Sequence, residues 1–223
     1  MATPRLQRYL ATLERRPFET DLERVAAAIR SLGVPVEDWI LGIHEQFAGY
    51  VEPLGSGEEA VYGIYHPRSK WLAPRGIDGD DTPGDWWVSC ADAHPSFDFG
   101  LYCDRSFLGH GSGGSSDSFE RKLEKDALWH EFAAGARVQY VLSHLRGGAK
   151  ALAEEIVERL QPEPDLASDS FDTFFWIEDV LIRKSSEDRD IVAIRSAEIP
   201  SWMPAKDCYL VSNPWSPGAR SPK

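Results

Sequence analysis

Apolar residues in the first fifty positions recur with the spacing of amphipathic helices. Three leucines spaced four and three residues apart predict a helix over residues 4–16. Thr20 and Glu23 have the form of a capping box, so a second helix is expected to run from there to Gly33 as its C-cap. A third helix is expected over residues 35–49, with proline in its first turn and glycine at its end.

The pattern then changes to short runs of β-branched and aromatic residues separated by turn residues. The expected strands cover residues 60–65, 85–90, 97–103 and 105–108. Their close spacing leaves no room for crossover helices and therefore favours an antiparallel meander over βαβ units.

Helical periodicity returns after a Gly/Ser loop at residues 109–116. Asp117 and Glu120 form an N-cap pair for a helix, and helical sequence is expected to continue through residues 138–145 and 149–160. After residue 160 strand-forming residues dominate. The segments 174–182 and 190–195 are expected to form a hairpin around residues 185–188, and a last strand is expected at 208–211.

Together these elements predict an α+β protein with N-terminal helices, a central antiparallel sheet, a long helical segment and a C-terminal β-hairpin. The proline-rich segment that begins at residue 161 is the best linker candidate. We therefore expect an α+β core domain over residues 1–160. A C-terminal β-rich extension over residues 161–223 is expected to pack on that core and to end in a loose tail.

Composition narrows the possible partners. The formal net charge is −12, which disfavours binding to nucleic acid or to an anionic membrane and suits a basic protein partner. We expect no signal peptide; no long apolar run occurs in the sequence, and its three cysteines form no CxxC pair. A cytoplasmic protein without a disulfide framework, zinc–cysteine site or cofactor is expected, and the pattern leaves its oligomeric state open.

The acidic stretch, residues 76–104, holds seven aspartates, five aromatic residues and no lysine or arginine. Surface carboxylates accelerate association with basic partners, and aromatic side chains supply binding energy. The expected partner-binding residues are Asp78, Asp80, Asp81, Asp85, Trp86, Trp87, Asp92 and Asp98. Because alternate residues of a strand point to opposite faces, one of the two tryptophans is expected in the core and the other is available as an anchor.

An enzymatic alternative uses the same region. The aspartates at positions 78–81 match the DxDxT pattern of aspartate-based phosphotransferases, but no buried strand precedes them. A metal-assisted hydrolase would instead use Asp80 and Asp81 with a histidine such as His94 or His110. The six histidines form no HExxH or HxH pair, and the glycines of residues 109–114 lack the βαβ context of a dinucleotide site.

The order of features resembles the SUKH superfamily of bacterial immunity and adaptor proteins. The resemblance lies in Leu32-Gly-Val-Pro35 between two helices, in Asp85-Trp-Trp-Val88, and in Ser115-Ser-Asp-Ser-Phe-Glu120 at a helix start. It covers residues 22–132 and has no counterpart in the last ninety residues. It implies a non-enzymatic protein that binds and neutralises a cognate toxin, and it supplies no catalytic residues.

Overall fold

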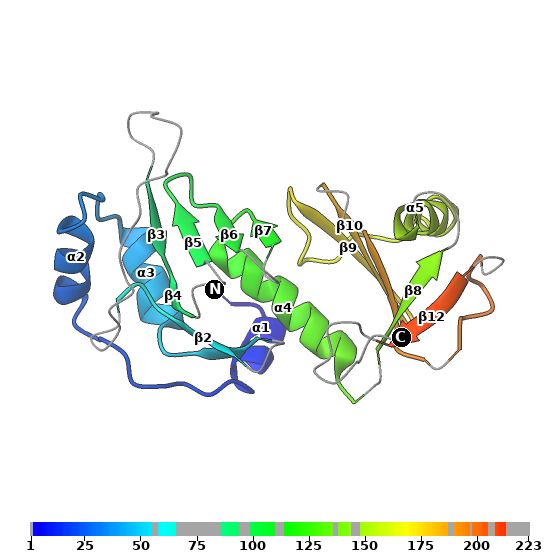
Figure 1. The fold of residues 1–223 in the computed structure, drawn as a ribbon, viewed down its shortest axis with the longest axis horizontal. Coiled ribbons are helices and arrows are strands. Elements are labelled where there is room, and N and C mark those ends of the chain that lie inside the picture. The colour runs from blue at the N-terminus through cyan, green and yellow to red at the C-terminus, as the bar shows by residue number, and fades with distance from the viewer. Residues whose placement is uncertain are drawn as a thin grey trace, which may run out of the picture. The chain divides into compact units, whose positions relative to one another are not determined.

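The fold is that of an α+β protein, as the sequence predicts (Figure 1). The structure is a computed structural model that describes residues 2–54, 58–65, 86–93, 99–109, 114–135, 138–143, 148–186, 190–196, 198–204 and 208–212. The chain divides into two compact units. The N-terminal unit is Gln7–Lys122, and the C-terminal unit is Leu123–Lys223 together with Thr3–Leu6. The boundary that the sequence suggested at residue 160 lies inside the C-terminal unit.

Three helices begin the chain: α1 (Pro4–Leu10), α2 (Leu22–Arg30) and α3 (Asp38–Phe47). The first is shorter than the expected range of 4–16. The second is capped by Asp21 and not by the expected Thr20, because the Asp21 carboxylate accepts hydrogen bonds from the backbone N–H groups of Glu23 and Arg24. The existence and order of all three helices agree with the prediction, and only their ends differ.

The strands of the N-terminal unit form two antiparallel sheets, ordered β1-β2-β4 and β3-β5-β6-β7. Their bounds are β1 Val51–Pro53, β2 Glu59–Tyr62, β3 Trp87–Ser89, β4 Ala91–Asp92, β5 Phe99–Tyr102, β6 Phe107–Gly109 and β7 Gly114–Ser116. Cys90 joins the two sheets, since its N–H donates to the carbonyl of Phe99 while its own carbonyl accepts from Gly63. The extended segment 87–92 therefore pairs with β5 before Cys90, as β3, and with β2 after it, as β4.

An aromatic core fills the N-terminal unit. Phe119 begins helix α4 (Phe119–Ala133), and its ring lies 5.1–5.8 Å from the rings of Phe47, Tyr62 and Phe107. All four side chains are at most 3% exposed. The start of α4 thus packs against α3 and two strands, β2 and β6.

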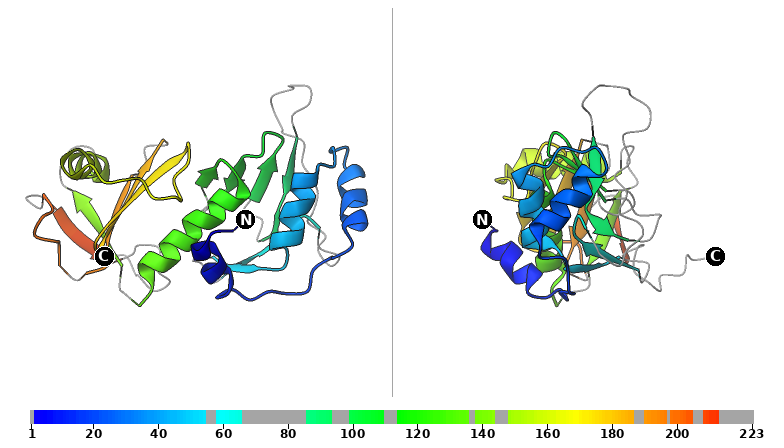
Figure 2. Two further views of the ribbon diagram at one scale, coloured as in Figure 1. Left: turned by 180° about the vertical axis from the view of Figure 1, so that it is seen from behind. Right: turned by 90° about the vertical axis from the view of Figure 1, so that its left-hand side faces the viewer.

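The C-terminal unit is a five-stranded antiparallel sheet with a helix on each face (Figures 1 and 2). Its elements are β8 Gln139–Ser143, α5 Ala149–Leu160, β9 Asp172–Ile177, β10 Val180–Ser185, β11 Ile191–Ile194 and β12 Cys208–Ser212, with the strands ordered β12-β8-β11-β10-β9. Phe174 and Leu181 pack on Leu128 and Phe132 of α4, whereas their chain neighbours pack on α5. This alternation is the period of two that a sheet buried on both faces requires.

Two predictions for this unit were wrong. Residues 138–145 were expected to be helical, but Gln139–Ser143 forms β8, which pairs with β11 on one side and β12 on the other. Residues 174–182 were expected to be one strand, but a turn at Glu178 and Asp179 divides them, and Glu178 has φ +50°. The hairpin between β10 and β11 and the final strand are confirmed.

The start of the chain is bound into the C-terminal unit. Arg5 donates two hydrogen bonds to the carboxylate of Asp165, at 2.6 and 2.9 Å, and a third to Glu131 of α4 at 2.8 Å. The loop that carries Asp165 lies along the outer edge of β9, where the Asp165 N–H donates to the carbonyl of Phe174. This loop covers part of a sheet edge that would otherwise be open to pairing.

Gly49 is the position at which an added methyl group is expected to be most harmful. It has φ +85°, and a Cβ atom there would lie 2.2 Å from the Arg16 carbonyl oxygen. We expect Gly49→Ala to lower the free energy of unfolding by about 2–4 kcal/mol. Gly42 lies inside α3, and a Cβ atom there would meet no other atom within 4 Å. Gly42→Ala is therefore the matched control and should raise stability by about 0.5–1 kcal/mol. Urea unfolding of both variants measures this, and equal stabilities would contradict it.

Candidate functional site

Three of the eight expected partner-binding residues lie in the described part of the chain: Trp86, Trp87 and Asp92. The other five, Asp78, Asp80, Asp81, Asp85 and Asp98, lie outside the described residues, as do His94 and His110 of the hydrolase alternative. Their roles stay predictions. Asp92 is half-buried in β4, opposite Val61 of β2.

Trp86 is part of the packing between α3 and the sheet. It is 9% exposed, and its ring stacks on Trp39 of α3 with the centroids 6.1 Å apart and the planes 18° from parallel. The guanidinium of Arg105 lies 5.8 Å from the centre of the Trp39 ring. Trp86 is therefore the core member of the tryptophan pair and is not available to a partner.

Trp87 points to the opposite face and forms the anchor pair with Tyr102. The two residues are direct cross-strand partners in β3 and β5, and their rings stack at 6.3 Å with an interplanar angle of 22°. The Trp86 carbonyl accepts a hydrogen bond from the N–H of Cys103. Because hydrogen-bonded and non-hydrogen-bonded pairs alternate along an antiparallel ladder, Trp87 and Tyr102 form a non-hydrogen-bonded pair. The side chains of such a pair lie closer together, which favours stacking of the two rings. Both rings are half-buried.

Gly100 makes room for the anchor pair. A Cβ atom on Gly100 would lie 3.2 Å from the Trp87 ring and 3.3 Å from the Tyr102 ring, tighter than ordinary contacts. Both aromatic rings therefore lie close to the backbone of β5. A flat aromatic surface held by backbone and cross-strand packing presents large contact area with little entropy to lose on binding.

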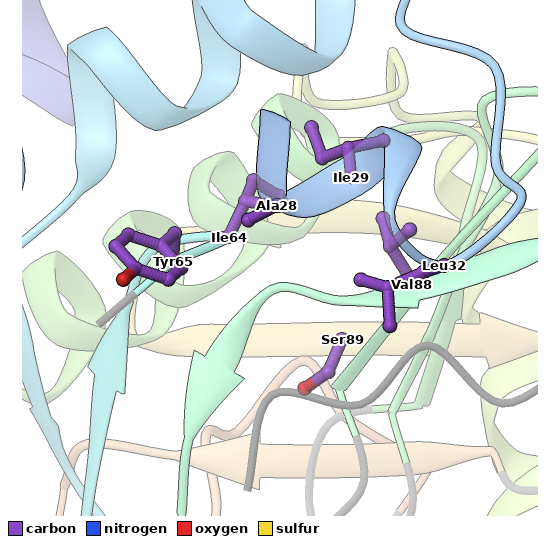
Figure 3. A pocket seen from close by; sticks show the side chains of 7 residues that line it. All are labelled: Ala28, Ile29, Leu32, Ile64, Tyr65, Val88 and Ser89. Carbon is purple, nitrogen blue, oxygen red and sulfur yellow. The ribbon is translucent and has the colours of Figure 1, made fainter. Parts of the chain in front are cut away.

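An apolar notch lies beside β3 (Figure 3). It is lined by Ala28, Ile29, Leu32, Ile64, Tyr65, Val88 and Ser89. The first three come from α2 and the residue shortly after it, the next two follow β2, and the last two belong to β3. No lining residue is charged. Leu32 is 41% exposed, so the notch is open to solvent on that side.

His44 fixes one wall of the notch. Its ring is fully buried, and its Nδ1 accepts a hydrogen bond from the backbone N–H of Ile64 at 3.0 Å. Its Nε2 lies 2.7 Å from the carbonyl of Glu19, which assigns the proton to Nε2 and makes the ring neutral. Burial lowers the pKa of His44 below its ordinary value. Sequence reasoning considered this histidine only as a possible metal ligand.

Sequence reasoning also missed two buried lysines on α4. The Lys122 ammonium contacts Glu52 Oε2 at 2.5 Å and the Tyr62 hydroxyl. The Lys125 ammonium lies 2.9 Å from Asp169 and 2.7 Å from Asp172. Both lysines are less than 10% exposed. Their burial could have been predicted from their positions on the apolar stripe of α4, since Lys122 lies three residues after Phe119 and Lys125 lies three residues before Leu128.

The described residues contain no group of three or more His, Cys, Asp or Glu side chains arranged to hold a metal ion. Cys90 is fully buried, and burial raises the pKa of its thiol, which opposes formation of the thiolate. Within the same described ranges, no helix has the length and apolar character needed to span a membrane.

Comparisons with known proteins found no family model, no curated protein and no solved structure that matches this chain. The proposals below therefore rest on the residues and geometry described above and on the SUKH resemblance.

The neutral His44 makes stability depend on pH. Because its pKa is lower in the folded state than the value near 6.5 expected for the unfolded chain, the unfolded state binds more protons below that value. This stability contribution is full above about pH 6.5 and is lost as the pH falls toward the folded pKa. We expect the urea midpoint of the wild type to fall between pH 7 and pH 5, and His44→Leu to fall less over the same range.

The control is His130→Gln, which removes an exposed histidine of α4 and leaves His44 in place. An equal fall in His44→Leu and wild type would exclude His44 as the source of the fall.

Proposed function

We propose that this protein is an immunity-type protein that binds a basic bacterial toxin and neutralises it by covering its active site. The observation that carries the proposal is the anchor pair, Trp87 and Tyr102, which lies half-exposed within the acidic stretch. Tryptophan and tyrosine are enriched among the residues that dominate binding energy at protein interfaces.

The net charge of the chain also supports binding to a basic toxin. With a net charge of −12, the chain attracts a basic protein over distances of about a Debye length, roughly 8 Å at physiological ionic strength. Carboxylates around an aromatic anchor then favour a cationic partner over an acidic one, because like charges across an interface are costly. The SUKH resemblance gives the partner its class, since immunity proteins of that superfamily act on toxins.

The inhibitory mechanism is occlusion. A toxin that acts on nucleic acid binds phosphate with clustered lysine and arginine side chains. Aspartates of the acidic stretch would pair with those cations in place of the substrate, while the anchor pair fills an apolar depression near them. No cofactor is needed for this, and the site of action is the cytoplasm, where the toxin would otherwise reach its substrate.

Charge reversal tests the acidic stretch. We expect the triple variant Asp78→Lys, Asp80→Lys and Asp81→Lys to bind the inactivated product of a neighbouring toxin-like gene at least about tenfold more slowly than wild type at low salt. The matched control reverses Glu154, Glu155 and Glu158, three exposed carboxylates of α5. Stopped-flow association at two salt concentrations measures both rates.

Equal association rates for the triple variant and wild type would contradict the assigned surface. A wild-type protein that neither binds the toxin nor protects cells that produce it would contradict the function itself.

Removal of one aromatic ring tests the anchor pair. Trp87→Ala is expected to weaken equilibrium binding by about tenfold or more through faster dissociation, because hot-spot aromatics contribute at least about 1–2 kcal/mol. Trp176→Ala, which removes a half-buried tryptophan from β9, should leave the dissociation constant unchanged. Calorimetric titration of each variant with the inactivated toxin gives the comparison, and equal losses would remove the special role of Trp87.

A further inference from the structure

Strand β3 has an open edge. It is the first strand in the order β3-β5-β6-β7, so among the described residues it is paired on one side only. On the side of β5, the carbonyl of Trp86 accepts a hydrogen bond from the N–H of Cys103, and the N–H of Cys90 donates one to the carbonyl of Phe99. Because backbone groups alternate along a strand, the N–H and C=O groups of Trp87 and Ser89 point away from β5. No described residue forms a hydrogen bond with these four groups.

The edge is open because β2 and β3 diverge. Val61 and Tyr62 of β2 pair with β4, and Gly63 donates the last bond, to Cys90. The next residue, Ile64, donates its N–H to His44 and so leaves the sheet. The apolar notch occupies the resulting fork, with Ile64 and Tyr65 on one side and Val88 and Ser89 on the other (Figure 3).

We propose that an extended, lysine- or arginine-rich segment of the partner protein adds as a strand to the edge of β3 and places an aliphatic side chain in the notch. This inference rests on the proposed function and names how the partner is held. In strand addition the main-chain hydrogen bonds give affinity and a pocket for alternate side chains gives specificity. The edge of β3 and the notch supply these two parts at one place.

The chemistry of the site selects this occupant. Trp87 and Ser89 each present one donor and one acceptor, which only an extended backbone satisfies as a set. The uncharged lining of the notch accepts an apolar side chain and penalises burial of a charged one. The charge of −12 and the cation-free acidic stretch make flanking basic residues favourable in the partner segment.

The first test removes one donor from the edge. Ser89→Pro eliminates an N–H that points away from β5, so the bonds between β3 and β5 remain. The second test, Leu32→Glu, places a charge at the rim of the notch. Each variant is expected to bind the inactivated product of the neighbouring toxin-like gene at least about tenfold more weakly than wild type. Leu160→Glu is the matched control, because Leu160 in α5 is also 41% exposed, and its affinity should equal that of wild type.

Hydrogen exchange of the wild-type protein gives a readout that does not depend on a variant. The amides of Trp87 and Ser89 are expected to exchange rapidly in the free protein and to become protected by at least about tenfold in the complex. Circular dichroism of Ser89→Pro shows whether the variant is folded. If it is not, Leu32→Glu and the exchange data decide.

The outcomes separate the two proposals. Wild-type protein that fails to bind the toxin overturns the proposed function and strand addition with it. Wild-type binding that Leu32→Glu does not weaken, or that leaves the amides of Trp87 and Ser89 unprotected, overturns strand addition and leaves the function standing.

Discussion

The structure depends on two buried ammonium groups of helix α4, each of which is paired with polar side chains of a different unit. Lys122 completes the N-terminal unit through Glu52 and Tyr62, and Lys125 completes the C-terminal unit through Asp169 and Asp172. A buried charge left without its partner costs about 3–5 kcal/mol, a large part of the stability of an ordinary domain. Helix α4 therefore contributes to each unit a cation whose burial is tolerated only when the rest of that unit is folded around it. Within each unit, this requirement fixes the register of the part of α4 that belongs to it.

The candidate site follows from a second constraint, the change of partner at Cys90. A regular strand would have continued its pairing with β5 on one side and β2 on the other, and no open edge would exist. Because the Cys90 N–H faces β5 and its carbonyl faces Gly63, the strand divides into β3 and β4. That division exposes the backbone of Trp87 and Ser89 and leaves the fork in which the notch lies. The Cys90 side chain at this point is fully buried.

Periodicity was enough to predict the α+β class, the first three helices and most strands, since these depend on local pattern. It failed at residues 138–145, because a short apolar run has no period that separates a buried strand from a helix, and pairing with distant β11 and β12 decided the outcome. Alternation predicted that one tryptophan would be buried, but only the stack on Trp39 identifies it as Trp86. The notch could not be predicted, because it joins residues 28–32, 64–65 and 88–89. The pairing of Lys122 and Lys125 is equally non-local.

The bond between Arg5 and Asp165 has a consequence for how the protein is made. The two residues are 160 positions apart, so at roughly 5–20 residues per second the ribosome needs roughly 8–30 s after Arg5 to reach Asp165. During that time the loop that Arg5 binds does not yet exist. The nascent chain must therefore keep Arg5 available until the segment that carries Asp165 has been synthesised. The C-terminal unit is thus completed by residues that are translated before the N-terminal unit.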